Sequence, residues 1–199
     1  MTYGEMKDFV LQLLNTYSVA GSKVAQTYND QADLIARIPA LTRDGLLYVT
    51  TTVRRLRAVT ELVCPETVGD MHIFDLPDDC YQLCGGLLRV DGDGVHRVRN
   101  YQVLAGRRVI LPKFQDGVWL AEYFRYPAVP AGIPEDDDFL DCPPEAQSAV
   151  AYYVAAHLAM EDNNYLHGAL YNEFEMKLLR LQEGQLLECG VTEDVYAAG

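Results

Sequence analysis

Several features that mark large protein classes are missing from this sequence. It contains no run of 18 apolar residues, so we expect no membrane-spanning helix. Its first residues, MTYGEMKDFVLQLLNTY, carry acidic side chains early and no basic stretch or cleavage site, so we expect no signal peptide. Neither the Gly-x-x-x-x-Gly-Lys-Ser/Thr loop that cradles phosphates nor the Gly-x-Ser-x-Gly nucleophile motif occurs. These absences argue against common nucleotide-binding and hydrolase classes.

Cysteine is scarce, and its spacing matches no common zinc pattern. There are five cysteines, an odd number, and Cys80 and Cys84 form the only close pair. Without an export signal, free thiols in a reducing cytoplasm are a better interpretation than a disulfide framework. A metal or redox role for the close pair is the alternative. The three remaining cysteines are Cys64, Cys142 and Cys189.

Basic residues are few, since 16 Lys/Arg stand against 29 Asp/Glu for a net charge of −13. Residues 135–199 carry two basic and 14 acidic residues. Residues 1–61 carry seven basic and six acidic residues. This distribution leaves no broad basic face for wrapping nucleic acid. The one basic cluster, VRRLR, is predicted to end a helix, where cations meet the negative end of the helix dipole. Its arginines are Arg54, Arg55 and Arg57.

The hydrophobic residues, 49% of the chain, are enough for a core of one domain, with or without a sizeable insertion. Apolar residues between Met6 and Tyr17 recur at steps of three and four, which predicts an amphipathic helix. A second helix is predicted from Asn29 or Asp30, with a kink or break at Ile38–Pro39. The periodicity then continues through Leu46, Val49, Val53 and Leu56.

The middle of the chain favours β-structure. MHIFDLP reads as a strand. GLLRV-DGDG-VHRVRN reads as a hairpin, because Asp-Gly supplies the positive φ of tight turns, and YQVL-AGR-RVILP reads as a second hairpin. DGVWLAEYFRYP follows as an aromatic strand. Together these segments predict a small antiparallel sheet of about four or five strands.

The last third predicts two antiparallel helices. The first begins at CPPEAQ and ends at Asn163-Asn164, and the second has apolar residues from Leu166 to Leu181 at helical spacing. Between them, AHLAMEDNNYLH holds His157, Glu161 and His167. The Glu-x-x-His repeat of dinuclear carboxylate sites and the His-Glu-x-x-His motif are both absent. We therefore expect a bend with a hydrogen-bonded core histidine, and a metal site is the alternative.

The predicted fold class is α+β: an antiparallel α-helical bundle formed by the N- and C-terminal helices, with an inserted small antiparallel β-sheet. Residues 1–61 and 142–184 would form the bundle. Residues 62–141 would form the β-rich insertion with an acidic linker, and residues 185–199 a C-terminal arm. Acid runs beside prolines are usually solvated, although such carboxylates could also hold a cation. Those in the linker are Asp136, Asp137 and Asp138.

The order of these parts resembles a known family. The opening T...YNDQADLIARIPALTRDGLLYV is similar to that of head-tail adaptor (connector) proteins of tailed bacteriophages. The stretch from FRYPAVPAGIPEDDDFLDCPPEAQ through AYYVAAHLAM to YNEFEMKLLRLQ resembles their closing segment. The resemblance covers about residues 1–61 and 118–184 and leaves the hairpin-rich middle aside.

The resemblance implies a structural virion protein with no enzyme activity and no cofactor. Such adaptors form a ring, commonly of twelve copies, beneath the portal at the capsid vertex. The ring binds a downstream tail or stopper protein, and double-stranded DNA passes through it without specific binding. The expected location is the neck of the virion, and the host cytoplasm before assembly. Residues 185–199 would be the portal-binding arm, with apolar anchors at Leu186, Leu187, Val191, Val195 and Tyr196.

The charge pattern suits such a ring, because subunits in a closed ring make head-to-tail contacts. The arginines of VRRLR and the aspartates of the linker are the candidates for opposite sides of that contact. Alternatively, the acidic residues line the channel. Two other functions remain open: a metal-dependent enzyme that uses His157, Glu161 and His167, and a soluble protein-binding module.

Overall fold

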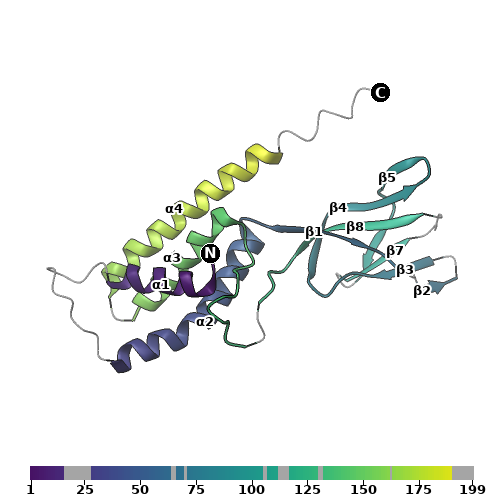
Figure 1. Ribbon diagram of the computed structural model, residues 1–199. Helices are drawn as coiled ribbons and strands as arrows, with labels where there is room; N and C mark the ends of the chain where they lie inside the picture. The colour runs from purple at the N-terminus through teal and green to yellow at the C-terminus, as the bar shows by residue number, and fades with distance from the viewer. Residues whose placement is uncertain are drawn as a thin grey trace. The chain divides into compact units, whose positions relative to one another are not determined.

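The structure of the protein is a computed structural model (Figure 1). It describes residues 1–15, 28–63, 66–69, 71–104, 107–111, 117–129, 132–161 and 163–189. The described residues form a mixed α+β structure with four α-helices and two small antiparallel sheets. The chain divides into two compact units: a helical unit, Met1–Arg54 with Pro127–Gly199, and a β unit, Arg55–Tyr126.

Helix α1, Tyr3–Asn15, confirms the first predicted helix. Its start is fixed by a reciprocal pair of hydrogen bonds. The Glu5 amide donates to Thr2 Oγ1 at 3.2 Å, and the Thr2 amide donates to Glu5 Oε2 at 2.9 Å. This capping box satisfies two backbone donors that the first turn leaves without helical partners. Met6 and Val10 are fully buried, so the predicted apolar face is the one that packs.

The prediction at Ile38–Pro39 was a kink or a break. Helix α2, Tyr28–Thr52, runs through Pro39, so there is no break at this position. Proline removes one amide donor and leaves the carbonyl of Ile35 without it. The side chain of Ile35 is 41% exposed, so this position lies near water. Burial of Ile38 just before the proline and of Leu46 after it holds both halves against the same core.

The threonine hydroxyls in the β-branched run of α2 find partners within the helix. The hydroxyl of Thr50 donates to the carbonyl of Leu46 at 2.7 Å, and that of Thr51 donates to the carbonyl of Leu47 at 2.6 Å. Buried hydroxyls thereby find partners one turn back along the helix.

Helices α3, Pro144–Ala159, and α4, Asn164–Cys189, confirm the predicted pair and its bend. The amide of Leu166 donates to Asn163 Oδ1 at 3.0 Å, so Asn163 caps the start of α4. Contacts pair Tyr153 with Phe174 and Tyr152 with Lys177. Residue numbers rise on α4 as they fall on α3, so the two helices are antiparallel.

Alanine makes α3 the central helix of its unit. Six alanines of α3 are buried, and α3 contacts α1, α2 and α4. Small side chains let neighbouring helices approach closely, and all four helices contribute to one hydrophobic cluster. The six are Ala146, Ala149, Ala151, Ala155, Ala156 and Ala159.

The β unit contains two four-stranded antiparallel sheets instead of the single predicted sheet. The first has the order β1-β8-β4-β5, with β1 Leu56–Glu61, β8 Val118–Arg125, β4 Cys80–Asp91 and β5 Gly94–Val98. The second has the order β2-β3-β7-β6, with β2 Glu66–Val68, β3 Met71–Asp75, β7 Arg108–Leu111 and β6 Gln102–Leu104.

Both predicted hairpins are confirmed. Asp91 pairs with Gly94 across the first turn, where Gly94 has φ 131°, and β6 pairs with β7 in the second. The core of the β unit is built from Phe74, Leu87 and Trp119, among other residues. The predicted strands from MHIFDLP and DGVWLAEYFRYP are β3 and β8.

One segment expected to be helical is a strand. Helix α2 ends at Thr52, and Leu56–Glu61 forms β1, an edge strand paired with β8. Arg55 and Arg57 therefore do not meet a helix dipole, and that part of the prediction is wrong. Half-buried and exposed residues alternate along β1, as on a strand with one face toward a core.

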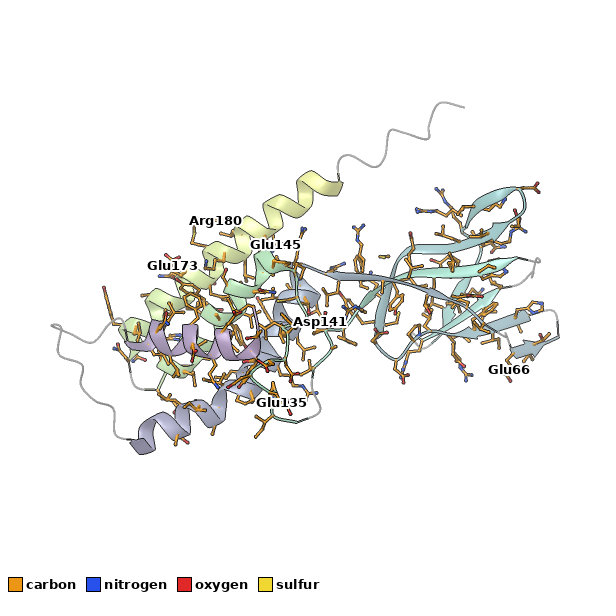
Figure 2. All side chains as sticks on the ribbon, in the orientation of Figure 1. Glu66, Glu135, Asp141, Glu145, Glu173 and Arg180 are labelled. Atoms are coloured by element: carbon orange, nitrogen blue, oxygen red, sulfur yellow. The ribbon has the colours of Figure 1, made fainter. Side chains whose placement is uncertain are left out.

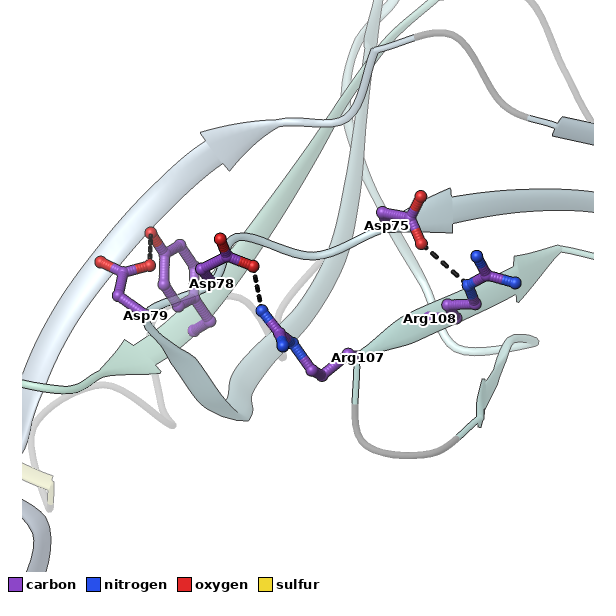
Figure 3. A network of polar contacts seen from close by, with 6 residues as sticks. Asp75, Asp78, Asp79, Arg107 and Arg108 are labelled. Atoms are coloured by element: carbon purple, nitrogen blue, oxygen red, sulfur yellow. Dashed lines mark hydrogen bonds and ion pairs between the residues drawn. The ribbon is translucent and has the colours of Figure 1, made fainter.

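Ion pairs join the end of β3 and the loop that follows it to the start of β7 (Figure 3). Arg107 pairs with Asp78, and Arg108 Nε donates to Asp75 Oδ1 at 2.9 Å. The hydroxyl of Tyr123 donates to Asp79 Oδ1 at 3.2 Å. The two ion pairs are largely exposed, so each contributes less than about 1 kcal/mol to stability. They position the loop more than they stabilise the unit.

Candidate functional site

The histidines of the α3–α4 bend have backbone partners. His157 Nδ1 lies 2.8 Å from the Tyr153 carbonyl, and His167 Nδ1 lies 2.9 Å from the Ala156 carbonyl. Because a carbonyl only accepts, Nδ1 is the donor in both. Within the described part of the chain, no group of three His, Cys, Asp or Glu side chains could hold a metal ion.

Glu161 also has a structural partner. Its two carboxylate oxygens accept from the two terminal nitrogens of Arg37 at 3.0 and 3.2 Å. A forked pair of this kind fixes orientation as well as distance. It joins the bend to α2, so the residues of the alternative metal site hold helices in place.

Tyr153 connects three helices beside the bend. Its hydroxyl donates to the carboxylate of Asp44 on α2, and its ring packs against Phe174 on α4 with centroids 5.3 Å apart. Burial and the neighbouring Asp44 carboxylate raise the pKa of Tyr153 well above its usual range. The tyrosine therefore stays protonated and acts as a fixed donor.

The acidic loop, Glu135–Asp141, is more than the solvated linker that was predicted. Its backbone carbonyls accept from the first turn of α1: the amide of Tyr3 donates to Asp138 O at 2.7 Å, and that of Gly4 to Asp136 O at 2.9 Å. The Asp136 carboxylate also pairs with Lys7 Nζ at 2.5 Å. The loop thus supplies partners to a helix N-terminus that would otherwise lack them.

Burial raises the pKa of Tyr3 to about 12, and the nearby Asp136 carboxylate contributes to that shift.

The predicted interface residues Asp136, Asp137 and Asp138 have different roles. The first and third hold the loop on α1, and the Asp138 carboxylate also accepts from the Glu135 amide at 2.8 Å. Asp137 is exposed.

Two large apolar side chains near the acidic loop face solvent. Ile133 is 82% exposed and Phe139 is 79% exposed. The cavity beside the loop offers about 20 Å³, which is room for one water and not for a small-molecule ligand. This region therefore presents a surface instead of a pocket.

A groove with basic side chains lies elsewhere on the helical unit, on α3, α4 and the residues that follow α2. The basic groove is lined by Arg54, Glu145, Ser148, Lys177, Arg180 and Leu181, and its volume is about 330 Å³. Arg54 pairs with Glu145 at 2.9 Å. Lys177 Nζ lies 4.8 Å from the ring centroid of Tyr152. Among the side chains that the structure describes, which on α4 end at Gln182, no carboxylate pairs with Lys177 or Arg180.

This basic groove contrasts with the unit that carries it. The helical unit has seven Lys/Arg and 19 Asp/Glu, which gives a net charge of −12. The β unit has nine Lys/Arg and ten Asp/Glu. Lys177 and Arg180 are the only two basic residues of the acidic last third of the chain. Sequence reasoning missed them, although their spacing of three places them on one helix face.

The three arginines of VRRLR fall in different units. Arg54 belongs to the helical unit and lines the basic groove. Arg55 and Arg57 belong to the β unit, where their guanidinium carbons lie 5.1 and 5.9 Å from the ring centroid of Phe124. Contacts of this kind between a cation and an aromatic face contribute about 0.5–1 kcal/mol at exposed sites.

The predicted C-terminal arm begins inside a helix. Residues 185–189, including Leu186 and Leu187, belong to α4, so the prediction of an irregular tail is wrong for them. Val191, Val195 and Tyr196 lie outside the described residues.

Cys80, Cys84 and Cys142 are free thiols. Burial raises the pKa of the Cys142 thiol to about 12, and the Asp141 carboxylate adds to the shift. The thiol of Cys142 is therefore a small buried group at neutral pH and not a nucleophile.

The sequence matches no protein-family model, and no curated protein matches it. No described helix combines the length and the apolar character that crossing a membrane would require.

Proposed function

We propose that the chain is a structural adaptor of a bacteriophage neck. In this proposal it has no enzyme activity and assembles as a ring beneath the portal, which links the capsid vertex to the tail. It would be found in the virion, and in the host cytoplasm before assembly. The N-terminal helices α1 and α2 and the C-terminal helices α3 and α4 would act as one antiparallel bundle, with the β unit inserted between them.

The observation that carries the proposal is the set of apolar side chains that the helical unit leaves in water. Ile133, Phe139, Met176 and Leu179 are between 48% and 82% exposed. Exposed apolar side chains flanked by charged ones are typical of surfaces that bind other proteins. Together with the family resemblance, this favours assembly over catalysis.

The charge of the helical unit fits a channel for DNA. A surface with a net charge of −12 repels phosphates, so a duplex would slide past it without binding. Docking on the portal would use the C-terminal arm, whose apolar anchors are Leu186, Leu187, Val191, Val195 and Tyr196.

The direct test mixes the purified chain with the portal protein of the same phage and images the product by electron microscopy. We expect a closed ring of this chain on the portal. A chain that stays separate from the portal and is absent from assembled particles would refute the proposed function.

Two truncations test the arm without confusing it with the helix. One variant lacks residues 190–199 and keeps all of α4, and the other lacks residues 185–199 and shortens α4 by five residues. Loss of docking in both variants supports the arm beyond α4 as the portal-binding element. Unchanged docking of the longer deletion would eliminate the arm from portal binding.

A further inference from the structure

We propose that the contact between neighbouring copies is made by the acidic loop of one copy docking into the basic groove of the next. The loop is Glu135–Asp141, and the basic groove is the surface defined above by Arg54, Lys177, Arg180 and their neighbours. This inference rests on the proposed function, because it names the contact by which the ring would close.

Among the side chains that the structure describes, Lys177 and Arg180 have no carboxylate partner, so this part of the groove carries positive charge. Lys177 and Arg180 stand three residues apart on α4, so their charges lie on adjacent positions of one face and repel each other. Glu145, the acid in the groove, already pairs with Arg54 at 2.9 Å. A carboxylate from a neighbouring copy would relieve this repulsion. The Arg180 guanidinium can donate two parallel hydrogen bonds to the two oxygens of such a carboxylate.

The acidic loop presents its charge in a fixed conformation. Its backbone is held on α1 through Tyr3 and Gly4, while the side chains of Glu135 and Asp137 are exposed. A segment that is already ordered loses little conformational entropy on binding. Phe139, which is 79% exposed, adds an apolar anchor to the same loop.

Matching apolar surface lies next to the groove. Leu181 lines it, and Met176, which stands four residues before Arg180 on the same helix, is 48% exposed. Residues four apart on a helix are neighbours on its surface. The loop and the groove therefore complement each other in apolar character as well as in charge.

The groove and the first residue of the acidic loop lie apart on one copy. Figure 2 shows Arg180 and Glu145 at one side of the helical unit and Glu135 at the opposite side, with Asp141, the last residue of the loop, between them in this view. Separation in a projection is a lower limit on separation in space. Two complementary surfaces on opposite sides of one unit make a head-to-tail contact, which closes into a ring when the rotation between copies allows it.

DNA fits the groove less well than an acidic loop does. The groove includes a carboxylate, that of Glu145, and its unit carries a net charge of −12. A nucleic acid would approach against that field, whereas a short loop brings its carboxylates to Lys177 and Arg180 alone.

Charge reversal on each surface, followed by the combined exchange, tests the proposal. The groove variant is K177E/R180E, and the loop variant is E135K/D137K, which spares the Asp136 and Asp138 side chains that hold the loop. We expect each to weaken self-association about tenfold or more in sedimentation velocity, since attraction becomes repulsion. The variant with all four substitutions restores the sign match, so its affinity should return to within about threefold of the wild type.

A matched control changes the same amount of charge elsewhere. Asp33 on α2 and Glu66 on β2 are exposed acids outside both surfaces, and D33K/E66K should leave self-association within about threefold of the wild type. Circular dichroism confirms that every variant is folded. An effect of the control equal to that of the loop variant would show that net charge alone is responsible and would overturn the proposal.

A zero-length cross-link identifies the contact directly. A carbodiimide joins the Lys177 amine to a carboxylate of the acidic loop only when the two touch. Mixing ¹⁴N- and ¹⁵N-labelled protein shows by mass spectrometry whether the joined peptides come from different copies. We expect mixed-isotope peptides that link Lys177 to Glu135, Asp136 or Asp137. Cross-links from Lys177 only to the C-terminal arm, or only within one copy, would contradict the proposal.

Two further results separate failure of this contact from failure of the proposed function. If K177E/R180E still forms rings on the portal, the adaptor function stands and the contact is wrong. If the wild type neither self-associates at millimolar concentration nor joins the portal, the adaptor function falls together with the contact. Binding of a short fluorescent duplex that K177E/R180E abolishes would assign the groove to phosphates and overturn the inference.

Discussion

Gly45 of α2 lies against Tyr153 and Val150 of α3, and adding a single methyl group there tests how the helices pack. A Cβ built on Gly45 would stand 2.8 Å from Tyr153 Cδ1 and 3.4 Å from Val150 Cγ1. Real Cβ contacts at 2.8 Å do not occur, so Tyr153 or a helix has to move. The Tyr153 hydroxyl is bonded to Asp44, and its ring lies 4.0 Å from that of His157 by centroids, so the ring has little freedom to give way.

The expected magnitude is a difference between two opposing effects. Replacing glycine by alanine inside a helix ordinarily stabilises it by about 0.5–1 kcal/mol. Overpacking a well-filled core costs about 1–3 kcal/mol. Because the clash is with a constrained aromatic ring, we expect Gly45→Ala to lower the free energy of unfolding by about 0.5–2 kcal/mol.

Gly168 on α4 provides the matched control, because a Cβ built there meets no atom within 4 Å. Gly168→Ala should therefore raise the free energy of unfolding by about 0.5–1 kcal/mol. Urea denaturation followed by circular dichroism at 222 nm, which reports on the helices, measures both variants. If Gly45→Ala is as stable as the wild type or more stable, the close approach of α2 and α3 is wrong.

Three further predictions concern the helical unit. Phe174→Ala, which empties a site that is 2% exposed, should cost about 3–5 kcal/mol in urea denaturation, and a cost below about 1 kcal/mol would contradict its place in the core. At pH 8, iodoacetamide followed by mass spectrometry should label Cys142 far more slowly than exposed Cys84, since a pKa of about 12 reduces its thiolate fraction on the order of a thousandfold below that of an ordinary thiol. Equal labelling would show that Cys142 is accessible. Stability should also fall as the pH rises above about 9, because the pKa values of Cys142 and Tyr3 are raised in the folded state, so the unfolded chain releases these protons first. The slope is about 1.4 kcal/mol per pH unit for each group between its unfolded and folded pKa, and thermal unfolding midpoints at pH 8 to 11 that do not fall would refute it.

The elements with strong local signals could be predicted from the sequence. The Asp-Gly turn before Val95 and the stripe from Leu166 to Leu181 depend on residues close together in the chain, and both appear as expected. The hydrogen-bonded histidine was also foreseeable, because His157 lies among apolar residues of α3.

The errors arose where distant contacts decide the local structure. Pro39 was expected to kink or break the helix, but α2 continues through it, because the burial of Ile38 and Leu46 on one core offsets the lost hydrogen bond. Leu56 continues the helical spacing of the apolar residues before it, so the segment was assigned to a helix. The alternation of half-buried and exposed residues along β1 was therefore missed. Its pairing with β8, some 60 residues away in sequence, outweighs local propensity.

The pairing of strands and the surface sites are set by the folded chain. Hairpin patterns identify neighbouring strands, but they do not show that β3 pairs with β7 while β4 pairs with β8, which separates the strands into two sheets. The basic groove joins Arg54 to Lys177 and Arg180 across more than 120 residues of sequence. Net charge showed that the last third is acidic, yet only the packing of α4 on α3 places its two cations beside Arg54.

The most direct test of the proposed function is the mass of the particle that forms when the purified chain is mixed with the portal protein proposed as its partner. One copy has a mass of 22.3 kDa. Native mass spectrometry or mass photometry should find the portal enlarged by a fixed multiple of that mass, near twelve copies if the resemblance holds, while K177E/R180E adds fewer copies or none. A portal of unchanged mass beside a free 22.3 kDa chain would contradict the account.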